Sequence, residues 1–408
     1  MIGSRTPGWS RAELSYCSNV HPGDSLEAVQ GVISQHLVAV RRQRELEYMA
    51  SGLWLSANAA RALCASESRL HRFAQGLDEQ GIRLVTLNGF PYGQFHGEQV
   101  KTGVYRPDWS EPERLTYTLD LARILAHCLP REQRTGSIST LPLGYAPGWD
   151  TDRHHRALSA LCDLAVALAD LQDRCGRHIR VCLEMEPGCR LESTVQAITL
   201  FAQELPEVAA RRGVPKEFIE RYLGLCYDVC HQAVMFENAS DALTEITRAG
   251  IPVGKIQISS ALELANPDQQ SGRERLGAFA EPRYLHQVRT RDQRRLLQGT
   301  MDLPEALADR TLPRHSPWRI HFHLPIQTAL LADGELGTTQ TAILDVLDHL
   351  SENPGMHPHL EVETYTWQVL PLSLRPSNDD GLHQGLGNEL RWLEVEMDRR
   401  GLLRETTP

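Results

Sequence analysis

Short apolar segments alternate with longer amphipathic segments along this chain, and the alternation constrains its fold more than any other feature. The apolar segments are bounded by Gly, Pro, Asn or Asp, as strands are. The segments between them carry apolar residues at i, i+3 and i+4, as amphipathic helices do. Eight such strand-helix units predict an α/β fold, a (β/α)8 (TIM) barrel over residues 10–370, with a doubly wound open sheet as the alternative. The predicted strands are 14–20, 52–56, 83–90, 137–145, 180–186, 223–229, 253–259 and 359–365, and the predicted helices are 25–44, 57–79, 111–129, 153–173 and 194–211.

The regular spacing breaks between residues 260 and 317. This stretch is charged, rich in Gln and Arg, and leads into a ninth apolar segment at 318–325. Because the loops that follow barrel strands line the active-site mouth, we expect a long insertion at about 261–318, before the last strand, to form a lid or a pocket wall. The tail, 371–408, is predicted to be an extension whose helix at 388–400 packs on the outside of the barrel.

Composition restricts the classes of partner. The 42 Lys and Arg against 52 Asp and Glu give a net charge of −10, which argues against nucleic acid or an anionic membrane as a partner. Nine scattered cysteines without a CxxC pair indicate reduced thiols in a cytoplasmic protein. No stretch approaches the ~20 apolar residues of a membrane span. We therefore expect a cytoplasmic protein that does not insert into a membrane and that acts on a small molecule. A homodimer is one possible assembly.

Four predicted strands end on side chains that can bind a metal ion. The strand at 180–186 carries Glu184 and Glu186 just before Pro-Gly, and the strand at 359–365 carries Glu361 and Glu363. Because the carboxyl ends of parallel strands meet at one mouth, these side chains should converge on one site. Carboxylates within apolar strands are costly unless they are paired or bound to metal. The other two strand ends supply Asp228 with His231, and Gln257.

Each of these residues also has a structural interpretation. Asp228 could cap a helix that carries a nearby surface histidine, and Gln257 could be a core amide bonded to backbone. His321 and His323 share one face of the ninth segment and could supply imidazole nitrogen to the metal instead. Only one glutamate of each pair needs to reach the ion. Further candidate substrate contacts are Asn88, Tyr92 and His96 in a Gly-rich loop, and His286 in the insertion.

The motifs E-P-G-C-R-L-E, D-V-C-H, I-Q-I and E-T-Y at the four strand ends resemble the xylose-isomerase-like barrel superfamily, notably hydroxypyruvate isomerases and ketose 3-epimerases. In those enzymes the matching residues bind one divalent cation, and two glutamates move protons. The resemblance implies that Glu186 and Glu363 are catalytic. It implies the metal ligands Glu186, Asp228, Gln257 and Glu363, and the substrate contacts His231, Arg190 and Glu192.

A closer resemblance covers most of the chain. The segments TLNGFPYGQFHG, VYRPDW, YTLDLARILA, GSISTLPLG, YLHQV, HFHLP and HLEVETYTW are similar to those of the EboE proteins, a family named for metabolite traffic. This resemblance implies a role in a metabolite biosynthesis or traffic pathway. It also implies that other proteins of an Ebo operon are partners.

The ligand types suggest the chemistry. Three carboxylates and an amide oxygen are hard donors that favour Mn²⁺ or Mg²⁺, whereas a histidine in the set would favour Zn²⁺ or Co²⁺. A cation bound by a carbonyl and its neighbouring hydroxyl acidifies the C–H bond between them and stabilises an enediolate. The first hypothesis is a metal-dependent isomerase or epimerase acting on a sugar, a cyclitol or a small hydroxy-ketone. The alternatives are a hydrolase like endonuclease IV and a non-catalytic metabolite-binding barrel.

Overall fold

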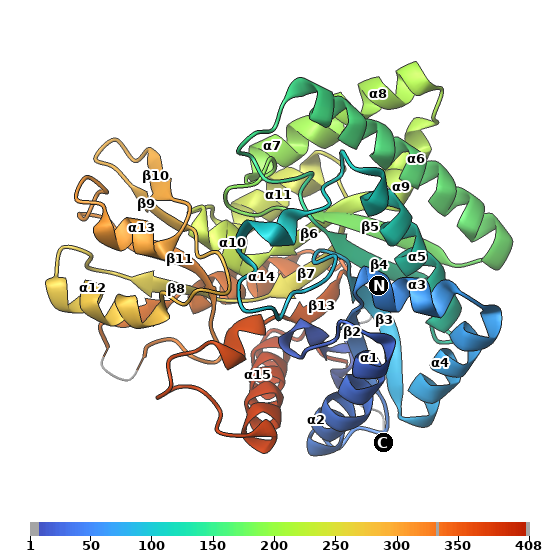
Figure 1. Ribbon diagram of the computed structural model, residues 1–408, viewed down its shortest axis with the longest axis horizontal. Helices are drawn as coiled ribbons and strands as arrows, with labels where there is room; N and C mark the ends of the chain where they lie inside the picture. The colour runs from blue at the N-terminus through green and yellow to red at the C-terminus, as the bar shows by residue number, and fades with distance from the viewer. Residues whose placement is uncertain (1–7, 332–333, 405–408) are drawn as a thin grey trace, which may run out of the picture.

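Eight parallel strands form a nearly closed barrel (Figure 1), which confirms the predicted fold class. The computed structural model describes residues 8–331 and 334–404. Around the barrel the strand order is β1-β13-β7-β6-β5-β4-β3-β2, and a parallel bridge between Cys17 and Gly52 joins the first strand to the second. The strands are β1 (Ser15–Tyr16), β2 (Met49–Trp54), β3 (Ile82–Asn88), β4 (Thr135–Thr140), β5 (His178–Glu184), β6 (Leu223–Asp228), β7 (Val253–Ile258) and β13 (His359–Val362).

Helices pack around the outside of the barrel, and most begin at a polar residue that caps the first turn. Ser66 caps its own helix by accepting a hydrogen bond from the Arg69 amide, so the predicted helix 57–79 is two helices. The longest helix ends at Gly176, whose φ of 68° suits the left-handed conformation of a helix end. The helices of the barrel are α1 (Leu26–Val32), α2 (Val38–Gln43), α3 (Ala57–Cys64), α4 (Glu67–Glu79), α5 (Pro112–Cys128), α6 (Thr151–Cys175), α7 (Thr194–Thr199), α8 (Leu205–Arg212), α9 (Lys216–Tyr222), α10 (Val229–Val234), α11 (Ala239–Arg248) and α14 (Gln340–Glu352).

The inside of the barrel carries a buried ion pair. Lys255 Nζ lies 2.5 Å from Glu361 Oε2, and neither side chain is exposed to solvent. The Lys255 ammonium also donates to Ser139 Oγ at 3.5 Å. Gly52 leaves room for this pair, because a Cβ at that position would lie 1.2 Å from Glu361 Oε1. The pair therefore occupies the barrel interior two residues below Gln257 and Glu363, toward the start of each strand.

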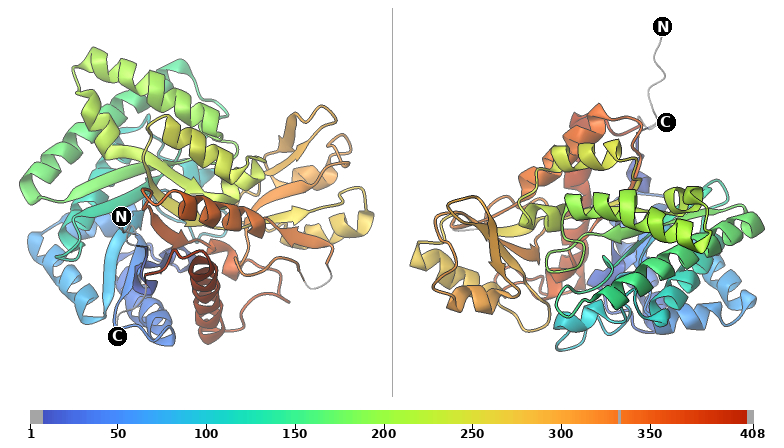
Figure 2. Two further views of the ribbon diagram at one scale, coloured as in Figure 1. Left: turned by 180° about the vertical axis from the view of Figure 1, so that it is seen from behind. Right: turned by 90° about the horizontal axis from the view of Figure 1, so that it is seen from above.

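The insertion forms a small antiparallel sheet beside the barrel (Figure 2). It runs from 261 to 338, further than the predicted 261–318, because the ninth apolar segment pairs with strands of the insertion. The strand order is β10-β9-β11-β8-β12. Its elements are β8 (Ala261–Leu264), α12 (Gln270–Leu276), β9 (Val288–Arg291), β10 (Leu297–Thr300), α13 (Leu303–Ala308), β11 (Trp318–His323) and β12 (Leu336–Thr338).

The C-terminal helix α15 (Asp379–Arg399) packs beside α2 on the outside of the barrel (Figure 1). Its Glu389 is fully buried and connects the helix to two other segments. Glu389 Oε1 accepts hydrogen bonds from the Ile326 amide at 3.2 Å and from Thr364 Oγ1 at 2.6 Å, and Oε2 accepts one from Trp367 Nε1 at 2.9 Å. Among the described residues, no helix has the length and apolar character needed to cross a membrane.

The stability of the chain should depend on the protonation of Glu389. Burial raises the pKa of this carboxyl to about 7, against hydrogen bonds that lower it. The folded chain therefore keeps a proton that the unfolded chain loses nearer pH 4.5, so the free energy of unfolding falls as pH rises through this window. The glutamine variant cannot lose this proton. Between pH 4.5 and about pH 7 the free energy of unfolding of Glu389→Gln should therefore rise by about 3 kcal/mol relative to that of the wild type, at 1.36 kcal/mol per pKa unit.

Denaturant unfolding of both proteins across the window measures this change. Glu352→Gln, at an exposed glutamate of α14, is the matched control and should show a constant difference from the wild type. A difference between Glu389→Gln and the wild type that does not vary with pH would contradict the prediction.

Candidate metal centre

The ends of four barrel strands bring the predicted polar side chains together. Asp228 ends β6 and pairs in register with Gln257 of β7, which pairs in turn with Glu361 of β13. Glu184 ends β5, and Glu363 directly follows β13. All five side chains are buried. These side chains therefore lie together at the carboxyl ends of the strands.

Three of these residues form an oxygen cluster, which consists of Glu184, Asp228 and Glu363. Each offers one carboxylate oxygen within 4.8 Å of the other two. The resemblance to the xylose-isomerase-like superfamily implied that Glu186 is a metal ligand with Asp228 and Glu363. Glu186 lies instead against His231 and His321. The reason is local: β5 ends at Glu184, and the following turn, closed by the bond from the Glu186 amide to the Leu191 carbonyl, carries Glu186 to the wall of the mouth.

The oxygen cluster fits a divalent cation. Glu184 Oε2, Asp228 Oδ2 and Gln257 Oε1 are buried and have no hydrogen-bond partner among the described residues. Leaving such an atom unsatisfied costs about 1–3 kcal/mol, and more when it is charged. Burial also raises the pKa of Glu184 to about 8 and holds the pKa of Glu363 well above its usual value. A bound cation would satisfy these oxygens, and oxygen donors of this kind suit Mn²⁺ or Mg²⁺.

Glu363 is held by two asparagines. Asn19 Nδ2 and Asn88 Nδ2 donate to Glu363 Oε1 at 2.8 and 2.9 Å. The other glutamate of this strand, Glu361, pairs with Lys255 inside the barrel. The structure thus separates the two glutamates: Glu363 reaches the mouth, and Glu361 does not.

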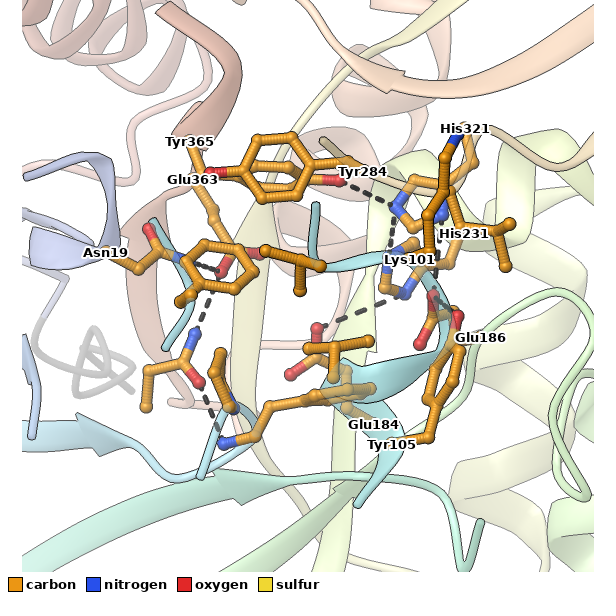
Figure 3. A pocket seen from close by; sticks show the side chains of 17 residues that line it. Asn19, Lys101, Tyr105, Glu184, Glu186, His231, Tyr284, His321, Glu363 and Tyr365 are labelled. Atoms are coloured by element: carbon orange, nitrogen blue, oxygen red, sulfur yellow. Dashed lines mark hydrogen bonds and ion pairs between the residues drawn. The ribbon is translucent and has the colours of Figure 1, made fainter. Parts of the chain in front are cut away.

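Glu186 occupies the opposite side of the mouth. Its Oε1 accepts hydrogen bonds from Tyr105 Oη at 2.7 Å and from Gln287 Nε2 at 3.3 Å. Burial raises the pKa of Glu186, and these donors oppose the shift. In Figure 3 Glu363 and Asn19 lie on one side of the pocket and Glu186 on the other, with Glu184 between them.

Three histidines, His231, His321 and His323, form an imidazole cluster next to the oxygen cluster. His231 Nε2 and His321 Nε2 are 3.0 Å apart. Burial lowers the pKa of His323 to about 4 and that of His321 well below its usual value. Burial also lowers the pKa of His231, but the carboxylates of Asp228, Glu186 and Glu184 outweigh it, so the net shift is upward.

The cavity that Glu184, Glu363, His231 and His321 line also has an apolar wall. Phe90, Phe95 and Val100 come from the segment after β3, and Tyr284 and Leu285 come from the insertion. Backbone bonds from the Val100 and Lys101 amides to the Arg283 carbonyl hold these two segments together. The insertion therefore contributes Tyr284 and Leu285 to the lining of the cavity.

The predicted substrate contacts separate into two groups. Asn88 and His231 line the cavity. The others do not reach it, within the part of the chain that the structure describes. His286 bonds through both ring nitrogens, to the His321 carbonyl and to Glu281; His96 bonds to the Asn19 carbonyl; and Tyr92 packs edge-on against Tyr117. Glu192 accepts from the Gly188 amide, and Arg190 donates its backbone amide to the Gly144 carbonyl.

Sequence reasoning missed several residues of the pocket. Asn19, Tyr105 and Gln287 bond to the two glutamates that face each other across it. Tyr105 comes from a 3-10 helix at Lys101–Tyr105 and Gln287 from the insertion, whereas Asn19 lies near the end of the predicted strand 14–20 and belongs in the structure to a 3-10 helix at Ser18–Val20. Tyr105 and Gln287 stand in the segments VYRPDW and YLHQV, and neither residue was assigned a role from the sequence.

Solved structures share this fold. The chain is 15% identical to a xylose isomerase domain protein from Planctomyces limnophilus, covering 97% of this chain and 99% of that one, with a TM-score of 0.50. It is 12% identical to a xylose isomerase-like TIM barrel protein from Mycobacterium smegmatis in complex with magnesium, covering 97% of this chain and 100% of that one, also with a TM-score of 0.50. At these identities the likeness shows a xylose isomerase-like TIM barrel fold. No protein-family model and no curated protein matches the chain.

Proposed function

We propose that this chain is a divalent-metal-dependent isomerase or epimerase acting on a small hydroxy-carbonyl compound, namely a sugar, a cyclitol or a hydroxy-ketone. One observation supports this most directly. Glu363 and Glu186 lie on opposite sides of one cavity (Figure 3), which Glu184 of the oxygen cluster also lines. Two carboxyl groups facing a substrate from two sides can remove a proton on one side and return one on the other.

The ion belongs at the oxygen cluster, with Glu184, Asp228, Glu363 and Gln257 as its ligands. When bound there, a divalent cation would polarise a substrate carbonyl and its neighbouring hydroxyl and so acidify the C–H bond between them. The oxygen donors favour Mn²⁺ or Mg²⁺, and Zn²⁺ or Co²⁺ remain alternatives.

Glu363 is the proposed base. Asn19 and Asn88 fix its Oε1, so Oε2 is the atom that takes the proton from the substrate carbon. Glu186 is the proposed acid on the other side, with Oε1 fixed by Tyr105 and Gln287. Return of a proton to the same carbon from the other face gives an epimer, and return to the neighbouring carbon gives an isomer.

The apolar wall supports the same chemistry. Phe90, Phe95 and Tyr284 line the pocket, and their apolar surfaces would limit the access of water to a bound substrate. Exclusion of water strengthens electrostatic interactions inside the site and hinders the loss of an abstracted proton to solvent. A pocket at the mouth of one barrel also suits a small molecule rather than a duplex, which agrees with the net charge of −10.

The resemblance to the EboE proteins stays a prediction. It would place the reaction in a metabolite biosynthesis or traffic pathway, with the other Ebo proteins as partners. Co-purification with those proteins tests this independently of the reaction.

Hydrogen exchange in heavy water tests the proposed function. Protein loaded with Mn²⁺ should introduce deuterium at the carbon beside the carbonyl of its substrate, at least about 10²-fold faster than buffer with Mn²⁺ alone. A panel of ketoses, hydroxypyruvate and cyclitol ketones, followed by NMR or mass spectrometry, covers the three substrate classes. Protein treated with a chelator is the control and should be inactive. Tight binding of a panel member without exchange would favour a metabolite-binding protein, and incision of abasic DNA would favour a hydrolase.

A further inference from the structure

A second cavity lies at the amino ends of the barrel strands, opposite the candidate metal centre. Its volume is about 1180 Å³, which is enough for a small molecule. The starts of β2, β3, β4, β5, β7 and β13 contribute to its lining. Arg180 of β5 lines this cavity and precedes Glu184 by four residues, about 13 Å along the strand. The two cavities are therefore separate.

Two glycines leave room for the side chain of Arg180. A Cβ at Gly224 would lie 3.0 Å from Arg180 Cδ, and a Cβ at Gly254 would lie 3.1 Å from the same atom. Because these glycines belong to β6 and β7, the aliphatic part of Arg180 crosses the two neighbouring strands. Arg180 Nε then donates to the Arg221 carbonyl at 3.2 Å. The guanidinium is thus held in place by its packing and by one hydrogen bond.

The terminal nitrogens of Arg180 have no acceptor among residues 8–331 and 334–404. No carboxylate pairs with this side chain there, and its bond to the Arg221 carbonyl uses Nε alone. Lys255, by contrast, pairs with Glu361 inside the barrel. Burial lowers the pKa of Arg180, the Cys182 thiol opposes the shift, and the Arg221 guanidinium adds to it. An anion next to Arg180 would relieve this unfavourable environment.

The charges that line the cavity leave Arg180 in excess. Its two carboxylates each pair with an arginine, Glu13 with Arg404 and Glu132 with Arg83. With its histidines neutral, the cavity therefore carries one net positive charge, although the whole chain carries −10. A cavity of this charge attracts an anion rather than a cation.

We propose that the cavity at the amino ends of the strands binds a small organic anion through the Arg180 guanidinium. The planar guanidinium matches the paired oxygens of a carboxylate or a phosphate group. Val85 and Ile251 line the same cavity and can pack against the apolar part of such a molecule. His178 lies beside Arg180, since its Nε2 donates to the same Arg221 carbonyl at 2.9 Å. Binding here does not depend on the reaction proposed for the other end of the barrel.

Anion binding to the metal-free chain tests this site. Chelator-treated and dialysed protein is titrated with inorganic phosphate, malonate and phosphoglycolate in a calorimeter. Removal of metal prevents these anions from binding to an ion at the oxygen cluster. At least one of them should bind saturably, with one molecule per chain. Binding of phosphate alone would identify a phosphate ester as the ligand, and binding of malonate alone would identify a carboxylate.

Two arginine variants locate the binding. Arg180→Gln should weaken it at least about tenfold, because it removes the charged, bidentate donor. Arg174→Gln, at an exposed arginine of α6, is the matched control and should bind as the wild type does. If Arg180→Gln fails to fold, as judged by circular dichroism, Arg180→Lys keeps the charge without the planar group and should still bind more weakly.

The position of the anion is a second readout, and it needs no variant. Tungstate, a heavy analogue of phosphate, is soaked into crystals of the wild type. Its anomalous signal should lie within hydrogen-bond distance of the Arg180 guanidinium.

Three results would each overturn the proposal. They are the absence of saturable binding by all three anions, equal affinity in the wild type and a folded Arg180 variant, and a tungstate site that does not touch Arg180. A cavity that holds only solvent predicts the first of these results. The proposed function fails separately, because hydrogen exchange is measured with metal bound at the other end of the barrel.

Discussion

Glu363→Gln is expected to slow hydrogen exchange into the substrate about 10³-fold, within the range that a positioned base contributes. The amide oxygen of glutamine can accept the bonds from Asn19 and Asn88, so the side chain should keep its place. The amide cannot accept the proton from the substrate carbon. Single-turnover exchange in heavy water, at saturating Mn²⁺, measures the loss.

Two comparisons separate this effect from simpler causes. The metal content of Glu363→Gln must be measured, because a neutral ligand weakens the oxygen cluster, and exchange is then compared at equal occupancy. Glu192→Gln, at a glutamate that accepts from the Gly188 amide outside the cavity, is the matched control and should exchange at the wild-type rate. Wild-type exchange by metal-loaded Glu363→Gln would assign the base to another residue.

Asp228→Asn should abolish the stabilisation of the chain by metal. A ligand that binds only the folded state at 100 times its Kd contributes about 2.7 kcal/mol, and the variant should lose this contribution. Asp228 also caps α10, since its Oδ1 accepts from the His231 amide at 2.8 Å. Asparagine caps helices as well as aspartate does, so the metal-free variant should stay within about 1 kcal/mol of the metal-free wild type.

Denaturation with and without Mn²⁺ or Zn²⁺ measures both quantities. Ser259→Ala is the control, because it removes the hydrogen bond that Ser259 Oγ donates to Asp228 Oδ1 and leaves the carboxylate in place. It should retain metal stabilisation. If metal stabilises Asp228→Asn as much as the wild type, Asp228 is only a helix cap.

The barrel could be predicted because its strands are buried on both faces and therefore apolar along their length. Strands β2, β3, β5, β6 and β7 lie close to their predicted positions, whereas β4 ends at Thr140, before the predicted end at 145. The first is shorter than predicted, since the chain turns into a 3-10 helix at Ser18–Val20. The last ends at Val362, before the predicted end at 365, because Thr364 already leaves the extended conformation, with ψ near 69°.

The candidate site was less predictable, for a physical reason. The two-residue period of a strand places Glu184 and Glu186 on one face but does not say where the strand ends. That end decides which glutamate joins Asp228 and Glu363. The imidazole cluster depends on how β11 pairs with β8 and β9, which is a tertiary contact between distant segments. Gln287 comes from an irregular segment, where no periodicity marks a residue that faces the pocket, and Asn19 lies in a 3-10 helix that replaces the end of the predicted strand 14–20.

The ion pair of Lys255 with Glu361, and the glycine that faces it, also restrict how this barrel can evolve. Loss of one member of a buried pair leaves the other charge unpaired, at a cost of about 3–5 kcal/mol. The two positions can therefore change only together or through a strongly destabilised intermediate. Gly52 can gain a side chain only after Glu361 has become smaller, because a Cβ would meet its carboxylate. Substitutions at these three positions can thus be tolerated only in a certain order. Laboratory evolution of a new substrate specificity is better directed at the apolar wall of the cavity, which these restrictions do not affect.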